Sequence, residues 1–301
     1  MIRTLPVILR RKQSFGAWYS AIKADGGTIE NPAYIQAEID KVPNASFAMF
    51  PGAYKSGVLY VPIPDDLSAN FMVDRASPVN TIGTNGLLRT LGVDFPAIDN
   101  TGGEPRLLLQ PQAINLYFPS AVLETQDRTT TAVEHTVSFF GTGTITFSGT
   151  YIGSLVGTGV NDRVELTFTP TAGTLTSTVT GSCTTGQLED YGYATTPVTT
   201  TGSTATRLQD TIKDGGSLAA FAHTDAIFQL KGIFRNGTIV LSDGTSSNRI
   251  QLAQTSSTSI IIRQQGGGTV AFNSAVTFTN LNVETKITLI SQASGFSVYE
   301  N

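Results

Sequence analysis

The sequence predicts a mainly β protein, built from antiparallel β-sandwich or jelly-roll domains with a short helical N-terminal segment. Two observations lead to this prediction. Hydrophobic residues make up 40 % of the chain and charged residues only 14 %, so hydroxyl and amide side chains must supply the polar surface, and threonine fits a pleated sheet well. Short runs of alternating apolar residues, separated by glycine-rich turns, recur at the spacing typical of a sandwich or jelly roll.

Residues 1–57 are expected to form a helical attachment segment. A first helix is predicted from Phe15 to Ala24, with Ser14 as its N-cap and Gly26-Gly27 beyond its end. A second is predicted from Asn31-Pro32 to about Val42, because proline suits the first helical position. Since two short helices bury too little surface to be stable alone, we expect them to dock on another part of the chain.

Residues 58–215 carry the clearest β pattern and are expected to form a jelly-roll domain. Asn85-Gly86 is a hairpin-turn signal between two apolar runs, and the composition of residues 96–105 predicts a loop. Apolar residues take alternate positions in the run 163–169, and Ile145 and Phe147 alternate with threonines. This alternation predicts sheets with one buried and one solvated face.

Residues 216–301 resume the β pattern, with Asp243-Gly244 as a further hairpin signal. The segment is short for two closed sheets and would be marginal by itself. Its last strand would leave an unpaired edge, which proteins normally cover. We therefore expect that it is not a self-sufficient sandwich and that this edge pairs with another subunit or with residues 58–215.

Composition argues against several classes of partner. The net charge of −4 provides no basic field for nucleic acid, and no apolar run approaches the length of about 20 residues that crosses a bilayer. The two histidines, His135 and His223, have no second His or Cys at metal-ligand spacing. Cys183 lies in a strand-like run and is expected to be a small buried residue. We expect no nucleic-acid partner, no membrane insertion, no metal and no cofactor.

Catalytic and ligand-binding signals are weak. A glycosidase needs two carboxylates across a sugar, and the acidic residues here stand in contexts that turn or strand-edge solvation explains. We therefore expect no enzymatic activity. Tyr191 and Tyr193 could stack on a sugar ring, although alternation places both on one face of a strand, where packing is the alternative. Asp243 and Asn248 offer oxygen ligands for calcium, with a simple Asp-Gly turn as the alternative.

Three segments carry a family resemblance. They are Phe71-Met72-Val73-Asp74-Arg75-Ala76-Ser77 with Asn85-Gly86-Leu87, then Glu104-Pro105-Arg106-Leu107-Leu108-Leu109-Gln110-Pro111-Gln112-Ala113-Ile114-Asn115-Leu116, and Gln187-Leu188-Glu189-Asp190-Tyr191-Gly192-Tyr193-Ala194-Thr195-Thr196-Pro197 with Thr204-Ala205-Thr206-Arg207. These stretches resemble signature segments of fibre and appendage proteins of tailed phages, especially of phages that infect Bacteroides-type hosts. In the second, Gln110 and Ala113-Ile114 replace the usual Glu and Arg-Thr.

The resemblance implies a fold and a location. In the family these segments belong to a carbohydrate-binding-module-like jelly roll. Residues 216–301 are similar to a concanavalin A or laminin-G type domain, with an incomplete domain as the alternative. The leucine run 107–109 would be core, and Glu189 and Arg207 would pair to lock the end of the domain. The protein would be a virion component, assembled in the host cytoplasm.

The leading functional prediction is a fibre or appendage subunit that contacts host-surface glycans. It would be a homotrimer and would join other phage virion proteins through residues 1–57. Two alternatives stay open at this point. One is a purely architectural virion protein without glycan binding, and the other is a glycan-degrading enzyme. Fold-level analogy to lectins is a weak argument for lectin function.

Overall fold

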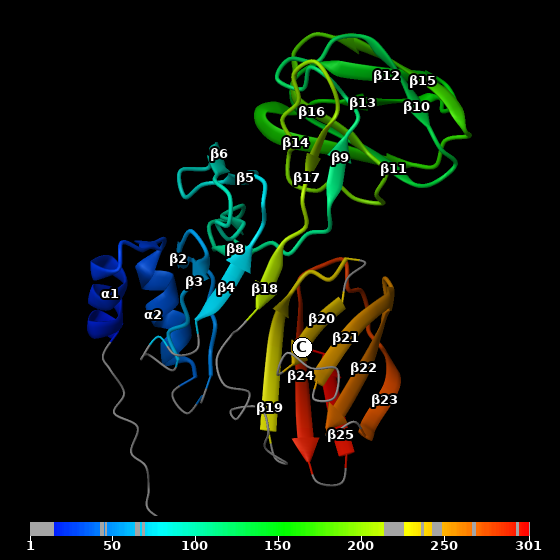
Figure 1. Ribbon diagram of the computed structural model, residues 1–301. Coiled ribbons are helices and arrows are strands. Elements are labelled where there is room, and N and C mark those ends of the chain that lie inside the picture. The colour runs from blue at the N-terminus through cyan, green and yellow to red at the C-terminus, as the bar shows by residue number, and fades with distance from the viewer. Residues whose placement is uncertain are drawn as a thin grey trace, which may run out of the picture. The chain divides into compact units, whose positions relative to one another are not determined.

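The computed structural model describes residues 15–42, 45, 47–63, 67, 70–213, 226–235, 238–242, 249–266, 269–292 and 295–300. The chain divides into two compact units, Met1–Gly215 (unit 1) and Gly216–Asn301 (unit 2). The predicted fold class is confirmed, because antiparallel strands dominate both units and the two helices of the described residues lie near the N-terminal end (Figure 1). Neither helix is long and apolar enough to cross a membrane.

Both predicted helices are present, as α1 (Phe15–Ala24) and α2 (Pro32–Asp40); Ser14 lies outside the described residues. Asn31 caps α2 with a left-handed backbone, φ 46°, and its side chain accepts a hydrogen bond from the Tyr34 amide at 3.2 Å. Asparagine visits this conformation at low cost because its short side chain bonds locally. Pro32 then starts the helix with its φ already fixed.

The helices bury their apolar stripes against the chain that follows, as expected. The indole N–H of Trp18 donates to the Val61 carbonyl at 3.1 Å. One core cluster joins the two helices to the strands beside them, and its buried members are Trp18, Ile22, Ile35, Ala53 and Tyr60. The pair of helices is therefore held by tertiary packing, which short helices require.

A five-stranded sheet brings the two ends of unit 1 together. Its order is β1-β2-β3-β4-β18, all antiparallel, with bounds Thr28–Ile29, Ala53–Lys55, Val58–Leu59, Phe71–Asp74 and Thr211–Lys213. Residue 57 is where the predicted attachment segment ends, and strands on both sides of it belong to this sheet. β18 pairs with β4 from Thr211 opposite Asp74 to Lys213 opposite Met72, so the chain returns to its start after passing through the β-sandwich.

Two short ribbons extend from this sheet. β5 (Val79–Ile82) pairs with β6 (Leu88–Leu91), and the Asn85-Gly86 turn between them is confirmed, with Gly86 at φ 75°. β7 (Ile98–Asp99) pairs with β8 (Arg106–Leu107), so part of the predicted loop 96–105 is strand.

The expectation that residues 107–109 are core is wrong for Leu109, which is 51 % exposed, because the chain leaves β8 at Leu107.

The middle of unit 1 is a two-sheet β-sandwich. One sheet has the order β10-β15-β12-β13 (Gln126–Thr130, Gly173–Thr180, Thr144–Gly149, Gly153–Val156), and the other β14-β11-β16 (Gly159–Phe168, His135–Gly141, Cys183–Glu189). The ribbon β9–β17 (Ala113–Asn115, Ala205–Arg207) joins them to the rest of unit 1. Side chains of both sheets form one core that includes Val137, Ile145, Phe147, Leu175 and Cys183. Cys183 is a buried free cysteine, as predicted.

Unit 2 has two sheets and a core of its own. The orders are β19-β24-β25 (Ala226–Gly232, Thr285–Gln292, Gly295–Glu300) and β20-β21-β22-β23 (Thr238–Ser242, Arg249–Ser256, Ser259–Gly266, Thr269–Thr277). Leu252, Ile262 and Leu289 are among the buried residues that the two sheets share. Among the described strands β25 lies at a sheet edge, as expected, and the partner expected for that edge stays a prediction.

Three buried charges hold the sandwich ends against the five-stranded sheet. Asp210 accepts from Arg75 Nη1 at 2.6 Å and from Arg207 Nη1 at 3.4 Å, and each of the three side chains is at most 3 % exposed. Asp210 also accepts from the Gln110 amide at 3.0 Å. Arg75 Nε donates to the Ser77 carbonyl at 2.8 Å. The charged cluster therefore links segments that are 100 to 135 residues apart in sequence.

Replacing Asp210 with asparagine should strongly destabilise unit 1, because it leaves two buried guanidinium groups without a countercharge. We expect the free energy of unfolding to fall by about 3–5 kcal/mol. Urea denaturation, monitored by the fluorescence of Trp18, measures the free energy of unfolding. Trp18 is the single tryptophan of the chain and lies in unit 1.

The matched control is Glu38→Gln, which removes an exposed ion pair with Lys41 on α2 and should cost less than about 1 kcal/mol. Equal losses in the two variants would contradict the structural importance of the buried cluster.

Candidate functional site

A polar hollow of about 390 Å³ opens beside the start of α2. Its volume lies within the range of small-molecule sites. Because most of its lining groups form hydrogen bonds, a hydroxylated ligand would suit it better than an apolar one. We call it the polar hollow, and its lining residues are Ile29, Glu30, Asn31, Thr84, Asn100 and Gly103.

Glu30 is the charged group of the polar hollow, and it is 7 % exposed. Its carboxylate accepts from Arg89 Nη2 at 3.2 Å, from Asn100 Nδ2 at 2.8 Å and from the Tyr54 hydroxyl. Burial by itself raises the pKa of Glu30, but the hydrogen bonds from Arg89, Tyr54 and Asn100 outweigh it and hold the pKa below its ordinary value. Glu30 therefore stays ionised and orients its neighbours.

Asn100 places an unsatisfied acceptor at the polar hollow. Its Nδ2 donates to Glu30 and, at 3.3 Å, to the Ile82 carbonyl, which fixes the orientation of the amide. Its Oδ1 is buried and has no hydrogen-bond partner. A buried orphan acceptor calls for a donor such as a water or a ligand hydroxyl. At the same hollow, Asn31 Nδ2 donates to the Gly103 carbonyl at 3.3 Å, which ties the start of α2 to the β7–β8 loop.

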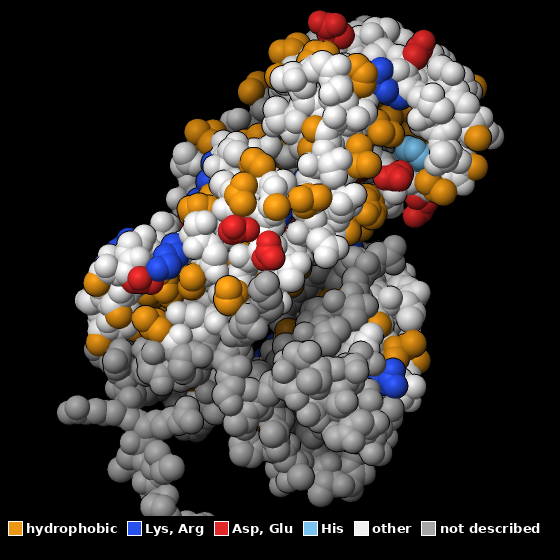
Figure 2. Space-filling view, in the orientation of Figure 1, with side chains coloured by type: hydrophobic (Ala, Val, Ile, Leu, Met, Phe, Trp, Pro, Cys, Tyr) orange, Lys and Arg blue, Asp and Glu red, His pale blue; other side chains and the backbone are white. Residues whose placement is uncertain are grey.

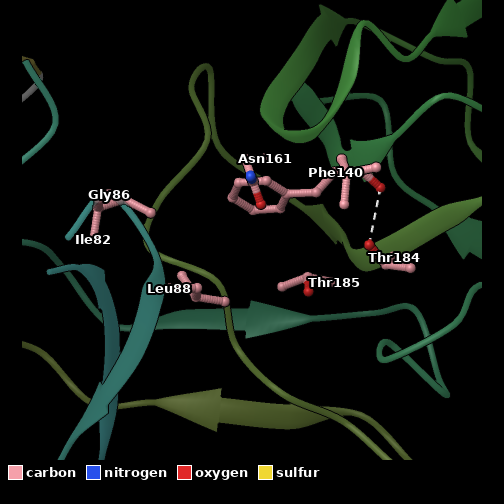
Figure 3. A pocket seen from close by; sticks show the side chains of 8 residues that line it. Ile82, Gly86, Leu88, Phe140, Asn161, Thr184 and Thr185 are labelled. Carbon is pink, nitrogen blue, oxygen red and sulfur yellow. Dashed lines mark hydrogen bonds between the residues drawn. The ribbon is translucent and has the colours of Figure 1, made fainter.

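A second, smaller hollow of about 90 Å³ lies between the β5–β6 hairpin and the β-sandwich (Figure 3). Ile82, Gly86 and Leu88 come from the hairpin, and the other lining residues are Phe140, Val160, Asn161, Thr184 and Thr185. None of these carries a charge. We call it the aromatic hollow. The β5–β6 hairpin supplies residues to both hollows, since Thr84 in its turn lines the polar one.

The tyrosines that the sequence singles out lie elsewhere. Tyr191 and Tyr193 are not on one face of a strand, because β16 ends at Glu189 and the chain bends away from the sheet. Their ring centroids are 5.9 Å apart, and the Tyr191 hydroxyl donates to the Gln112 carbonyl at 2.7 Å. Neither lines either hollow. Asp243 and Asn248 lie outside the described residues.

Sequence reasoning missed the residues of both hollows. Glu30 and Asn100 are 70 positions apart, and no local motif joins them. The closest signal is the Asn31-Pro32 helix start next to Glu30. This pair of residues predicts a helix and does not by itself indicate a site. Phe140 reads as an ordinary strand residue, and the irregular pairing around it has no signature in the residues.

No family model, curated protein or solved structure matches this chain. In the described part of the chain, no group of three His, Cys, Asp or Glu side chains is arranged to hold a metal ion. His135 is buried, and its Nδ1 lies 2.9 Å from the Val133 carbonyl.

A buried acid lies beneath the bend that carries the two tyrosines. Glu189 is fully buried and accepts from the Thr195 amide at 2.6 Å, from the Thr195 hydroxyl at 3.1 Å and from the Gln187 amide. The expected Glu189–Arg207 pair does not form, since Arg207 bonds Asp210. Burial raises the pKa of Glu189 to about 7, against the opposing influence of the Thr195 hydrogen bonds and of the nearby Arg163 charge.

Arg163 completes this buried network without pairing directly with the acid. Its Nη1 donates to the Thr195 carbonyl at 2.6 Å and its Nη2 to Ser138 Oγ at 2.7 Å, while its Nε has no partner. Glu189 has a perturbed pKa, which is common at functional sites, but no opening reaches it. The network therefore holds the segment 190–196 against β11.

Stability should depend on pH through Glu189. Because its pKa is raised from 4.5 to about 7 by folding, its contribution is complete below pH 4.5 and is lost as the pH rises through about 7. Relative to Glu189→Gln, the wild-type chain should lose on the order of 3 kcal/mol between these pH values. Urea titrations of both proteins, followed by Trp18 fluorescence, measure the difference. Glu165→Gln, at an exposed position of β14, is the control, and a wild-type profile identical to that of Glu189→Gln would refute the assignment.

Proposed function

We propose that this chain is a structural and adhesive subunit of a tailed-phage appendage, which contacts host-surface glycans without cleaving them. In this proposal residues 1–57 join the subunit to other virion proteins, and the subunit assembles as a homotrimer. The resemblance of residues 58–215 to fibre and appendage proteins supports the location. The alternative is a purely architectural subunit, and the glycan test below separates the two.

The polar hollow is the observation that supports glycan contact. Sugar hydroxyls donate and accept hydrogen bonds. The hollow is lined by the exposed Thr84 and by Asn100, whose Oδ1 is buried and has no hydrogen-bond partner. The groups around it are pre-oriented by the bonds of Glu30, which lowers the entropy cost of binding.

The surface agrees with a weakly charged glycan ligand. Charged side chains are sparse on the face of unit 1 that Figure 2 shows, where uncharged polar groups and scattered apolar side chains dominate. Long-range attraction to a strongly charged polymer would need a dense field of one sign. A ligand whose contacts are hydroxyls and amides therefore fits this surface.

The arrangement of carboxylates supports binding without hydrolysis. Glycoside hydrolysis uses a pair of carboxylates on either side of the scissile bond. Glu30 is the one carboxylate among the residues that line the two hollows. Its oxygens are occupied by Arg89, Tyr54 and Asn100, and its lowered pKa makes it a poor proton donor at neutral pH.

Filling the polar hollow should weaken glycan binding and leave the fold intact. Thr84→Trp places an indole at an exposed position on the rim, and we expect it to weaken binding of host surface polysaccharide by at least about tenfold, the effect of losing about 1.4 kcal/mol. Biolayer interferometry on the full chain measures the affinity.

Thr129→Trp, at an exposed position of the sandwich, is the matched control and should bind as the wild type does. Failure of the wild type to bind any polysaccharide would favour the architectural alternative. Release of reducing ends during the assay would identify an enzyme.

A further inference from the structure

We propose that the aromatic hollow binds the acetamido group of an N-acetylated sugar, so that the glycan ligand carries 2-acetamido residues. The proposal deepens glycan contact and rests on that proposed function. The aromatic hollow has no charged lining residue, and neither Tyr191 nor Tyr193 lines it.

Two irregularities in the sheet β14-β11-β16 build this hollow around Phe140. On one side, Phe140 pairs with Arg163 and Gly141 with Gly159, so residues 160–162 of β14 have no partner and bulge out. The bulge lifts Val160 and Asn161 out of the sheet.

On the other side, the β11–β16 register shifts between Ser138 and Phe140. The shift leaves Thr185 in the left-handed region at φ 50°, which is strained for a β-branched residue. The Thr184 hydroxyl donates to the Phe140 carbonyl at 3.1 Å and holds the shifted strand in place (Figure 3). A β-bulge can re-aim a side chain, and backbone strain of this kind persists only where the surrounding structure enforces it.

The lining of the hollow suits a small neutral group that is mainly polar and has one apolar end. Polar groups make up most of the exposed lining, Phe140, Ile82 and Leu88 are its larger apolar side chains, and none of the lining residues is charged. The volume of about 90 Å³ is far below that of a site for a whole drug-sized ligand, so it suits a substituent such as a methyl-bearing group.

Two free polar groups at the hollow match an amide. Neither the side-chain amide of Asn161 nor the hydroxyl of Thr185 bonds to any described residue. The Asn161 amide has both a donor and an acceptor, and an acetamido group presents one of each. The methyl would contact Phe140 and Leu88 while the amide bonds to Asn161. An O-acetyl group has no N–H and would leave the Asn161 acceptor unused.

Saturation-transfer-difference NMR on the full chain tests the assignment, with methyl N-acetylglucosaminide, methyl glucoside and N-acetyllysine as probes. We expect the acetyl methyl of the first probe to receive the strongest saturation. Affinity for it should exceed that for methyl glucoside by about tenfold, since one additional hydrogen bond and a buried methyl contribute that much.

Two variants separate binding from folding. Asn161→Ala removes an exposed amide, and Thr185→Gly removes a hydroxyl while relieving the positive φ. Both should lower the affinity for the N-acetylated sugar to that for methyl glucoside, and Thr185→Gly should melt no lower than wild type. Ile152→Ala, at a residue that is 84 % exposed and lies outside the hollow, should change nothing.

Each outcome bears on a separate claim. Equal affinity for the sugars with and without the acetamido group, or unchanged affinity in both variants, would overturn the acetamido assignment while glycan contact through the polar hollow stands. Saturation of N-acetyllysine but not of the N-acetylated sugar would overturn the assignment to a glycan. If neither sugar is saturated and the wild-type chain also binds no polysaccharide, the proposed function is overturned.

Discussion

The contact of Asp210 with Arg75 and Arg207 is the constraint on which the arrangement of unit 1 depends. Charges buried this deeply are unfavourable unless each is paired and hydrogen-bonded. The two arginines and Asp210 pair only when the segments that follow β4, β8 and β17 are all in place, because their hydrogen bonds reach Ser77, Gln110 and Pro111. Among these buried polar atoms, Arg207 Nε has no partner. Any other arrangement of these segments would leave a guanidinium without its partner.

The two hollows follow from this arrangement. The cluster holds the exit of the β-sandwich beside the β4–β18 pair, and Asn80 Nδ2 on β5 donates to the Pro197 carbonyl at 2.8 Å. The β5–β6 hairpin is thereby kept against the sandwich, where it closes the aromatic hollow. The same hairpin faces Glu30 through Arg89, which orients the groups of the polar hollow. The residues that line the two hollows are thus positioned by structural contacts elsewhere.

Local signals in the sequence predicted local structure well. The α1 bounds, the Asn31-Pro32 helix start and the Asn85-Gly86 turn each depend on a few neighbouring residues, and the structure confirms them. Period-2 alternation likewise predicted the buried Ile145 and Phe147. The hollows depend instead on register shifts around Phe140 and on a pairing of Glu30 with Asn100, which no single segment encodes. Tyr191 and Tyr193 were misplaced because alternation continues past Glu189 in the sequence while the strand does not.

Native-state hydrogen exchange of the full chain tests most directly whether the buried charges make unit 1 one cooperative structure. Amides of the β4–β18 pair and of β11 should then open with the same free energy, the global value for unit 1, because neither part keeps its structure without the other. Opening of the β4–β18 pair at a distinctly lower free energy than β11 would show two independent structures and would contradict the account.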